Sequence, residues 1–328
     1  MLTFRALQAS ADERDLPSKR LTPQYLIETL RALLAKSLPP HVVDDRFGDS
    51  WASGVAAGRL VGALAFDGED KTADEDEPAG EVVGAAVGLF SPEADSSGIR
   101  VALDCLVAPG RDRPSTLSPL LERAVKDAEL AGATRIETWL KPTEDSDEEV
   151  FAALGAVPYR TLHQMRRSLP LPVGLGGPAL ATRAFVPGVD EEALVHVNNR
   201  AFFDHPVQGT LTVQALVAEM AEPWFTADGV RMHEIDGVLA GFCWTKQHPG
   251  ALDESALGEI YVICVDPAFH GRGLGRPMTS AGLDWLAEHG SRVGMLYVEA
   301  DNAPAVRTYE SLGFEIVRTD RAWLIPVG

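Results

Sequence analysis

The fold is decided by the stretch LGEIYVICVDPAFHGRGLGRPMTSAGLDWLAEHG, residues 257–290 of the 328-residue chain. It begins with a β-rich run, continues through a glycine-rich loop, and ends in a segment with helical periodicity. Apolar residues recur in that last segment every three or four positions, which places them along one helix face, and Gly290 supplies the left-handed residue that ends the helix. These apolar positions are Leu274, Met278, Ala281 and Trp285. The stretch therefore predicts a strand, a loop and a helix in direct succession.

The loop inside this stretch predicts an anion-binding site. Its glycines let the backbone turn several N–H groups toward one point, and the helix start adds further donors and the positive end of a helix dipole. Such a site suits a pyrophosphate. Neither GxxxxGK[ST] nor GxGxxG is present, which makes a nucleoside triphosphate or a dinucleotide the weaker candidate, and a turn without a ligand stays open. The candidate phosphate-binding residues are His270, Gly271, Arg272, Gly273, Leu274, Gly275 and Arg276.

A second helix is predicted within LYVEADNAPAVRTYESLGF, residues 296–314. Asp301 or Asn302 can cap its N-terminus, because both side chains accept hydrogen bonds from first-turn N–H groups. Pro304 fits its first turn, and Gly313 ends it. The segment predicts a strand, a turn and a helix that follow the first helix.

A linker separates two similar halves of the chain. The segment SLPLPVGLGGP, residues 168–178, is rich in Pro and Gly, so neither a helix nor a central strand continues through it. On each side of it, a strand, a loop, a helix, a strand, a helix and a final strand follow in the same order. We therefore expect an α/β fold with a mixed sheet, duplicated in tandem, with domains at residues 1–170 and 182–328 and a linker at 171–181.

Charge and composition limit the partners. The net charge of -19 disfavours nucleic acid and anionic membranes, whose binding depends largely on Lys and Arg. The three cysteines have the spacing of neither a disulfide framework nor a zinc site. The N-terminal residues are too charged for a signal peptide, and the longest apolar run, residues 82–90, is too short to cross a membrane. We expect a cytoplasmic monomer that acts on a small molecule without a metal.

The loop and the segment after it resemble the Gcn5-related N-acetyltransferase (GNAT) family, whose loop has the pattern [QR]xxGx[GA]. His270 stands at the first position of this pattern, and Gly273 and Gly275 stand at the later ones. The segment NAPAVRTYESLGF, residues 302–314, is similar to the second family motif. The resemblance implies two tandem GNAT-like acyl-CoA N-acyltransferase domains that use acetyl-CoA.

Five longer segments carry a narrower resemblance: VNNRAFFDHPVQG (197–209), PWFTADG (223–229), FCWTKQHPG (242–250), LGEIYVICVDP (257–267) and LYVEADNAPAVRTYESLGF (296–314). They resemble the mycothiol synthases, which are tandem-domain GNAT enzymes of actinobacteria. This resemblance implies transfer of an acetyl group from acetyl-CoA to the cysteinyl α-amine of the cysteine–glucosamine–inositol precursor, the last step of mycothiol biosynthesis.

Acetyl transfer to an amine needs a base and an acid. A free α-amine has a pKa near 8, so its neutral form costs only about 1.4 kcal/mol at pH 7, and a modest base suffices. Glu259, between apolar Leu257 and Ile260, is the candidate base, with a solvent-facing carboxylate as the alternative. Tyr309 resembles the family's general acid, which protonates the coenzyme A thiolate, with a core tyrosine as the alternative.

The resemblance also implies binding roles. The backbone N–H groups of Ile263 and Val265 would polarise the thioester carbonyl and hold the pantetheine arm. Lys246, Tyr297 and Glu259 would contact the acceptor. The other implied coenzyme positions are Cys264, Asn302, Ala305 and Arg307.

Two departures put the acceptor in doubt. Mycothiol synthases have acidic residues where this sequence has Val207 and Pro23. Each acidic residue would recognise a hydroxyl or an amine of the acceptor. A GNAT enzyme acting on another small-molecule or peptide amine, or an acyl-CoA-sensing module without turnover, therefore stays open.

The first half departs further. Ser115 and Leu117 stand where loop glycines are expected, and their side chains would obstruct the close approach of a pyrophosphate. We predict a non-catalytic first domain. The remaining histidines lack the spacing of metal ligands and are expected in structural or surface roles. They include His205, His233 and His248.

Overall fold

The structure is a computed structural model that describes residues 2–6, 23–36, 55, 57, 59–68, 81–90, 99–140, 143–204, 208–248 and 256–327. Its contacts divide the chain into two compact units, which are described separately. The first unit is Met1–Thr161 with Thr319–Gly328, and the second is Leu162–Arg318.

The first unit contains one mixed sheet. Its strands lie in the order β1, β2, β3, β4, β5 and β12, and all neighbours are antiparallel except β4 and β5, which are parallel. The strands are β1 (Leu2–Ala6), β2 (Leu60–Asp67), β3 (Glu81–Phe90), β4 (Arg100–Val107), β5 (Arg135–Leu140) and the end of β12 (Glu315–Ile325). The helices are α1 (Pro23–Ala35), α4 (Arg113–Leu130) and α5 (Asp145–Ala153).

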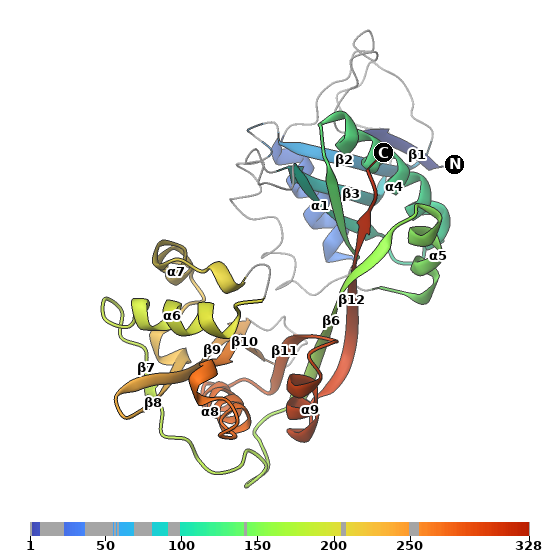
Figure 1. The fold of residues 1–328 in the computed structure, drawn as a ribbon. Coiled ribbons are helices and arrows are strands. Elements are labelled where there is room, and N and C mark those ends of the chain that lie inside the picture. Colours follow the sequence, from blue (N-terminus) through green and yellow to red (C-terminus); the bar gives the residue numbers. More distant parts are fainter. Residues whose placement is uncertain are drawn as a thin grey trace. The chain divides into compact units, whose positions relative to one another are not determined.

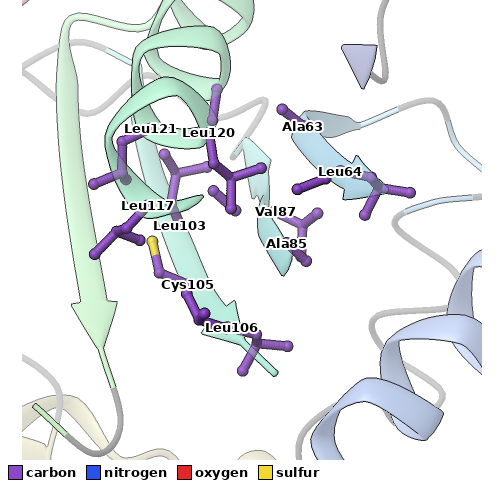
Figure 2. Close-up of a cluster of buried hydrophobic side chains, with 14 of the residues drawn as sticks. Ala63, Leu64, Ala85, Val87, Leu103, Cys105, Leu106, Leu117, Leu120 and Leu121 are labelled. Atoms are coloured by element: carbon purple, nitrogen blue, oxygen red, sulfur yellow. The ribbon is translucent and has the colours of Figure 1, made fainter. Parts of the chain in front are cut away.

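The core of the first unit lies between this sheet and its helices. Helix α4 packs against β1 to β4, and α1 packs against β3 and β4. Strand β2 is buried at nearly every position, as expected for a strand that is covered on both faces. Figure 2 shows side chains from β2, β3, β4 and α4 that meet in this core: Ala63, Leu64, Ala85, Val87, Leu103, Cys105, Leu106, Leu117, Leu120 and Leu121.

The second unit contains a mixed sheet of the same kind. Its strands lie in the order β6, β11, β10, β9, β8 and β7, and β10 and β11 form the parallel pair. The strands are the end of β6 (Val157–Ser168), β7 (Arg183–Ala184), β8 (Val230–Ile235), β9 (Val238–His248), β10 (Leu257–Val265) and β11 (Val293–Glu299). The helices are α6 (Glu191–Ala201), α7 (Val213–Met220), α8 (Gly275–Glu288) and α9 (Ala303–Ser311), with short 3-10 turns at Gln208–Thr210, Ala227–Gly229 and Pro267–Phe269.

Helix α8 packs closely on the second sheet. It covers β9 and β10 on one face, and α6 and α7 lie on the other face (Figure 1). A Cβ atom at Gly282 would lie 2.4 Å from Cys243 Sγ and 2.8 Å from Ile260 Cδ1. Glycine is therefore required at this contact, because real Cβ atoms do not approach other heavy atoms so closely. This contact holds the middle of α8 close to β9 and β10.

The predicted elements around the loop are confirmed. Helix α8 spans Gly275–Glu288 and is followed by Gly290 at φ +93°, and Asn302 caps α9 before Gly313 ends it at φ +81°. The chain divides differently from the expected domain limits at two places. Residues 162–168 pair with β11 in the second unit, and residues 321–325 pair with β5 in the first unit. No helix among the described residues is long and apolar enough to span a membrane.

Candidate active site

Among the described residues, one edge of strand β10 has no strand partner beyond Ile260. It pairs with β11 only from Leu257 to Ile260, whereas its pairing with β9 continues to Val265 across an irregularity after Ile260. The N–H of Asp266 donates to Ala240 of β9 at 2.9 Å. Because successive N–H groups of a strand point to opposite sides, those of Ile263 and Val265 are directed away from β9. The predicted thioester-binding N–H groups therefore lie on the open edge.

The loop after β10 has the backbone that the glycines predict. Gly271 and Gly273 have φ values of +76° and +74°, which favour glycine, and a Cβ at Gly275 would meet no protein atom within 4 Å. Leu274, the residue before α8, has no side-chain acceptor and does not cap the helix. The N–H groups of Gly275 and Arg276 are thus not capped by the preceding side chain, and the space beside Gly275 is open. These features fit a bound pyrophosphate.

The base of the loop is held by an ion pair and a histidine. Arg200 of α6 donates to Asp266 from Nε at 2.7 Å and from Nη2 at 3.2 Å. This hydrogen bonding lowers the pKa of Asp266. The Nε2 atom of His270 lies 2.9 Å from the carbonyl oxygen of Val265. The loop therefore starts from a fixed position at the end of β10.

The two loop arginines have different surroundings. Arg276 Nε donates to the carbonyl oxygen of Leu175 at 2.9 Å, and its Nη2 lies 3.3 Å from the carbonyl oxygen of Ser311. Its side chain thus joins the linker segment to α9 and does not point a free guanidinium at the loop. The guanidinium of Arg272 lies 5.0 Å from the ring centroid of Phe269. Arg272 is therefore the loop arginine whose described contact leaves its donors available to a phosphate.

Glu259 lies on the sheet face opposite α8. It is directly across from Lys246 on β9, and its Oε2 lies 2.7 Å from Nε2 of His248. All three residues are more than 90% buried. The solvent-facing alternative for Glu259 is therefore wrong. His248 was expected to be structural, and the prediction missed its contact with the candidate base.

Aromatic rings surround Lys246 on this face. Its Nζ lies 4.6 Å from the ring centroid of Trp224 and 5.6 Å from that of Tyr261. The hydroxyl of Tyr261 in turn donates to Glu219 Oε1 of α7. Lys246, Glu259 and Tyr261 thus form a row of polar groups between aromatic side chains, a typical lining for a small polar ligand.

Tyr309 is buried in the cluster that α8 and α9 form on the other face. Its ring centroid lies 6.0 Å from that of Phe314. Burial, with a smaller effect of the Cys243 thiol, raises the pKa of Tyr309. The phenol therefore keeps its proton throughout the neutral pH range, as a general acid requires.

The other predicted residues have mixed positions. The Oδ1 of Asn302 accepts from Ala305 N at 3.2 Å, so its side chain caps α9, and Arg307 is exposed on that helix. Cys264 is buried in the core on the α6 side, where burial raises the pKa of its thiol, so only its backbone can contribute to a cofactor site.

Among the residues predicted to recognise the acceptor, Tyr297 accepts hydrogen bonds at its hydroxyl from Gln164 Nε2 at 2.6 Å and from Arg318 Nη2 at 3.1 Å. Val207 lies outside the described residues, and Pro23 opens α1.

The corresponding region of the first unit lacks both the open strand edge and the uncapped helix start, as far as the structure describes it. Strand β4 pairs with β5 from Arg100 to Cys105, so these strands do not part where β10 and β11 do. Helix α4 is capped by Asp112, whose Oδ2 accepts from Ser115 N at 3.3 Å. The placement of Ser115 and Leu117 in a loop was wrong, because α4 already begins at Arg113 and Leu117 is fully buried in the core. Here a carboxylate stands at the helix start where a pyrophosphate would bind.

Comparisons with known proteins identify the family of this chain. The model of the acetyltransferase (GNAT) family matches residues 197–314. The chain is 39% identical to a mycothiol acetyltransferase of Mycobacteroides abscessus over 74% of this chain and 81% of that protein. It is 41% identical to a mycothiol acetyltransferase of Thermomonospora curvata over 72% of this chain and 77% of that protein.

Solved structures have the same fold. A GCN5-related N-acetyltransferase from Sphaerobacter thermophilus has a TM-score of 0.62 at 18% identity and covers 99% of this chain and 96% of its own. A tandem GNAT protein from the clavulanic acid biosynthesis pathway has a TM-score of 0.60 at 20% identity and covers 100% of this chain and 99% of its own. Fold and site thus define an acetyltransferase of the GNAT class, and the predicted tandem fold is confirmed. Within that class, the chain belongs to the mycothiol acetyltransferase family.

Proposed function

We propose that this protein transfers an acetyl group from acetyl-CoA to the cysteinyl α-amine of the cysteine–glucosamine–inositol precursor of mycothiol. The observation that carries the proposal is the open edge of β10, which continues into an uncapped helix start and bears the buried Glu259 on the same strand. The family relationship supplies the acceptor, because the relatives are mycothiol acetyltransferases.

Each binding group has a distinct task in this reaction. Acetyl-CoA supplies the acetyl group as a thioester. Residues 271–276 hold its pyrophosphate through backbone N–H groups and Arg272. The N–H groups of Ile263 and Val265 hold the pantetheine arm and polarise the carbonyl. Lys246 and Tyr297 lie on the face of Glu259 and contact the polyol part of the acceptor.

Two side chains move protons. Glu259 accepts the proton that the cysteinyl amine loses, directly or through one water, as its nitrogen attacks the carbonyl carbon. Tyr309 gives its proton to the sulfur as the carbon–sulfur bond breaks. The tyrosine is reprotonated from solvent, and the products are the acetylated amine and coenzyme A.

The replacement Tyr309→Phe tests the acid. We expect kcat to fall by about tenfold, because coenzyme A is a moderately good leaving group even without protonation. The ratio of wild-type to variant kcat should stay constant from about pH 6 to pH 9. The raised pKa of Tyr309 keeps its phenol protonated over this whole range. Steady-state rates across this range, at saturating acetyl-CoA, measure the ratio. If the two kcat values become equal as the pH falls, Tyr309 is not the general acid.

The acceptor is tested by product analysis. The protein is incubated with acetyl-CoA and cysteinyl-glucosaminyl-inositol, and coenzyme A and the acetylated product are quantified by chromatography and mass. We expect acetylation of this acceptor in preference to an aminoglycoside or a peptide N-terminus. If only another amine is acetylated, the named acceptor is wrong and the GNAT reaction still holds. If coenzyme A binds and no amine is acetylated, the acyl-CoA-sensing module is favoured.

A further inference from the structure

His248 is placed to act on the candidate base. It lies on β9 diagonally across from Glu259 on β10, because Lys246 pairs with Glu259 and His248 pairs with Leu257. Diagonal partners on one sheet face are within reach of long side chains. Here Nε2 of His248 lies 2.7 Å from Oε2 of Glu259, and both side chains are at most 11% exposed.

The donor and the acceptor at this contact follow from the proposed reaction. As the base, Glu259 is ionised, and an ionised carboxylate accepts hydrogen bonds and has none to donate, so His248 is the donor through Nε2–H. A neutral imidazole that donates to Oε2 leaves the carboxylate negative and able to take a proton at Oε1. A lysine or arginine in the same place would weaken the base, because a fixed positive charge favours the ionised carboxylate more strongly.

Two other charged groups on this face have described contacts of their own. Lys246, from the same strand as His248, lies over the rings of Trp224 and Tyr261. Glu219, from α7, accepts from the Tyr261 hydroxyl. Among the described residues, the hydrogen bond between His248 and Glu259 thus joins two buried side chains at the candidate base.

We propose that His248 is the positioning residue for Glu259: its Nε2–H holds Oε2 so that Oε1 faces the acceptor amine. This inference rests on the proposed acetyl transfer. His248 itself gains and loses no proton during the reaction. Its contribution is the fixed orientation of the base, which proton transfer requires within hydrogen-bond reach.

Two substitutions separate the hydrogen bond from the shape of the ring. His248→Phe keeps a ring and removes the donor, and we expect kcat to fall by about tenfold with the KM for acetyl-CoA unchanged. His248→Gln keeps an N–H donor at a similar reach and should restore kcat to within about threefold of the wild type. The matched control is His233→Phe, a histidine on neighbouring β8 whose Nδ1 lies 2.8 Å from the carbonyl oxygen of Ala181. This control should retain the wild-type kcat.

Three kinetic outcomes would overturn the proposal. These are full kcat in His248→Phe, equal losses in the Phe and Gln variants, and a change confined to the KM of the acceptor. Thermal melting and acetyl-CoA binding of each variant show whether it is folded. If His248→Phe does not fold, the proposal is tested by the kcat of His248→Gln and by the nitrogen spectrum described next.

A measurement without substrate tests the arrangement separately. In the imidazole nitrogen spectrum of the whole protein, the His248 signals are assigned by their loss in His248→Gln. We expect the Nε2 signal to carry the directly bonded proton that the hydrogen bond to Glu259 Oε2 requires. An Nε2 atom without a bonded proton would overturn the positioning role of His248, even if acetyl transfer is observed. If the spectrum is as expected and the wild type acetylates no amine, the proposed function fails and the catalytic role of His248 fails with it.

Discussion

Replacing Glu259 with glutamine is expected to lower kcat at pH 7 by about 100-fold or more, the usual contribution of a general base. The side chain is buried, held by His248, and located on the strand whose open edge is proposed to bind the thioester. Glutamine has the same shape and can still accept at its amide oxygen, but it cannot take a proton. Acetyl-CoA binding should therefore be preserved while turnover is lost.

The pH dependence of this loss tests the role of the base. The cysteinyl amine has an ordinary pKa near 8, so at pH 7 most of it is protonated and depends on Glu259. As the pH rises past 8, the amine loses its proton without assistance, and the difference between wild type and variant should shrink by about tenfold by pH 9. A loss that stays equally large at high pH would indicate a structural effect.

A matched control isolates the position. Glu288→Gln removes a carboxylate from the exposed end of α8 in the same unit and should leave kcat unchanged. Rates are measured from released coenzyme A by chromatography, since the acceptor carries its own thiol. If Glu259→Gln retains the wild-type rate at pH 7, Glu259 is not the base.

The sequence predicts those features that depend on local pattern. The helix ends at Gly290 and Gly313 and the cap at Asn302 follow from residue types, and all three are found. The loop conformation is equally local, because glycine is the residue that adopts positive φ without strain. The elements around the phosphate loop could therefore be located from one stretch of sequence.

Features that depend on strand register could not be predicted in this way. The contact of His248 with Glu259 arises only when β9 and β10 pair with Lys246 opposite Glu259. A signal did exist, since His248 follows Lys246 by two residues and must share its sheet face. The side-chain role of Arg276 was hidden for a similar reason, because its acceptors at Leu175 and Ser311 are far away in sequence.

The division of the chain into its two units could not be predicted from local sequence patterns either. Residues 321–325 pair with β5 of the first unit, although they follow the second helix of the other half. Repeat order alone assigns a final strand to the half that precedes it. Likewise, the early start of α4 follows from Asp112, which caps the helix two residues before Pro114 fixes the first turn.

Replacing Gly273 with valine is expected to weaken acetyl-CoA binding by about 100-fold, which corresponds to about 2.8 kcal/mol. Gly273 has φ +74°, where a β-branched residue is strained, and it belongs to the loop whose N–H groups are proposed to meet the pyrophosphate. The valine side chain would also occupy space beside these donors. Titration calorimetry of the whole protein with acetyl-CoA measures the change, and the wild type should bind one equivalent per chain.

Gly110→Val provides the matched control, because Gly110 lies in the corresponding loop of the first unit with φ +76°, and neither glycine has a protein atom within 4 Å of its added Cβ. Both substitutions therefore carry a similar backbone strain of about 1–2 kcal/mol. Only Gly273→Val should affect binding, since Asp112 caps α4 and β4 stays paired with β5 in the first unit. Equal losses in the two variants, or two equivalents bound by the wild type, would mean that the first unit also holds coenzyme A. Unchanged binding in Gly273→Val would instead remove the loop after β10 from the cofactor site.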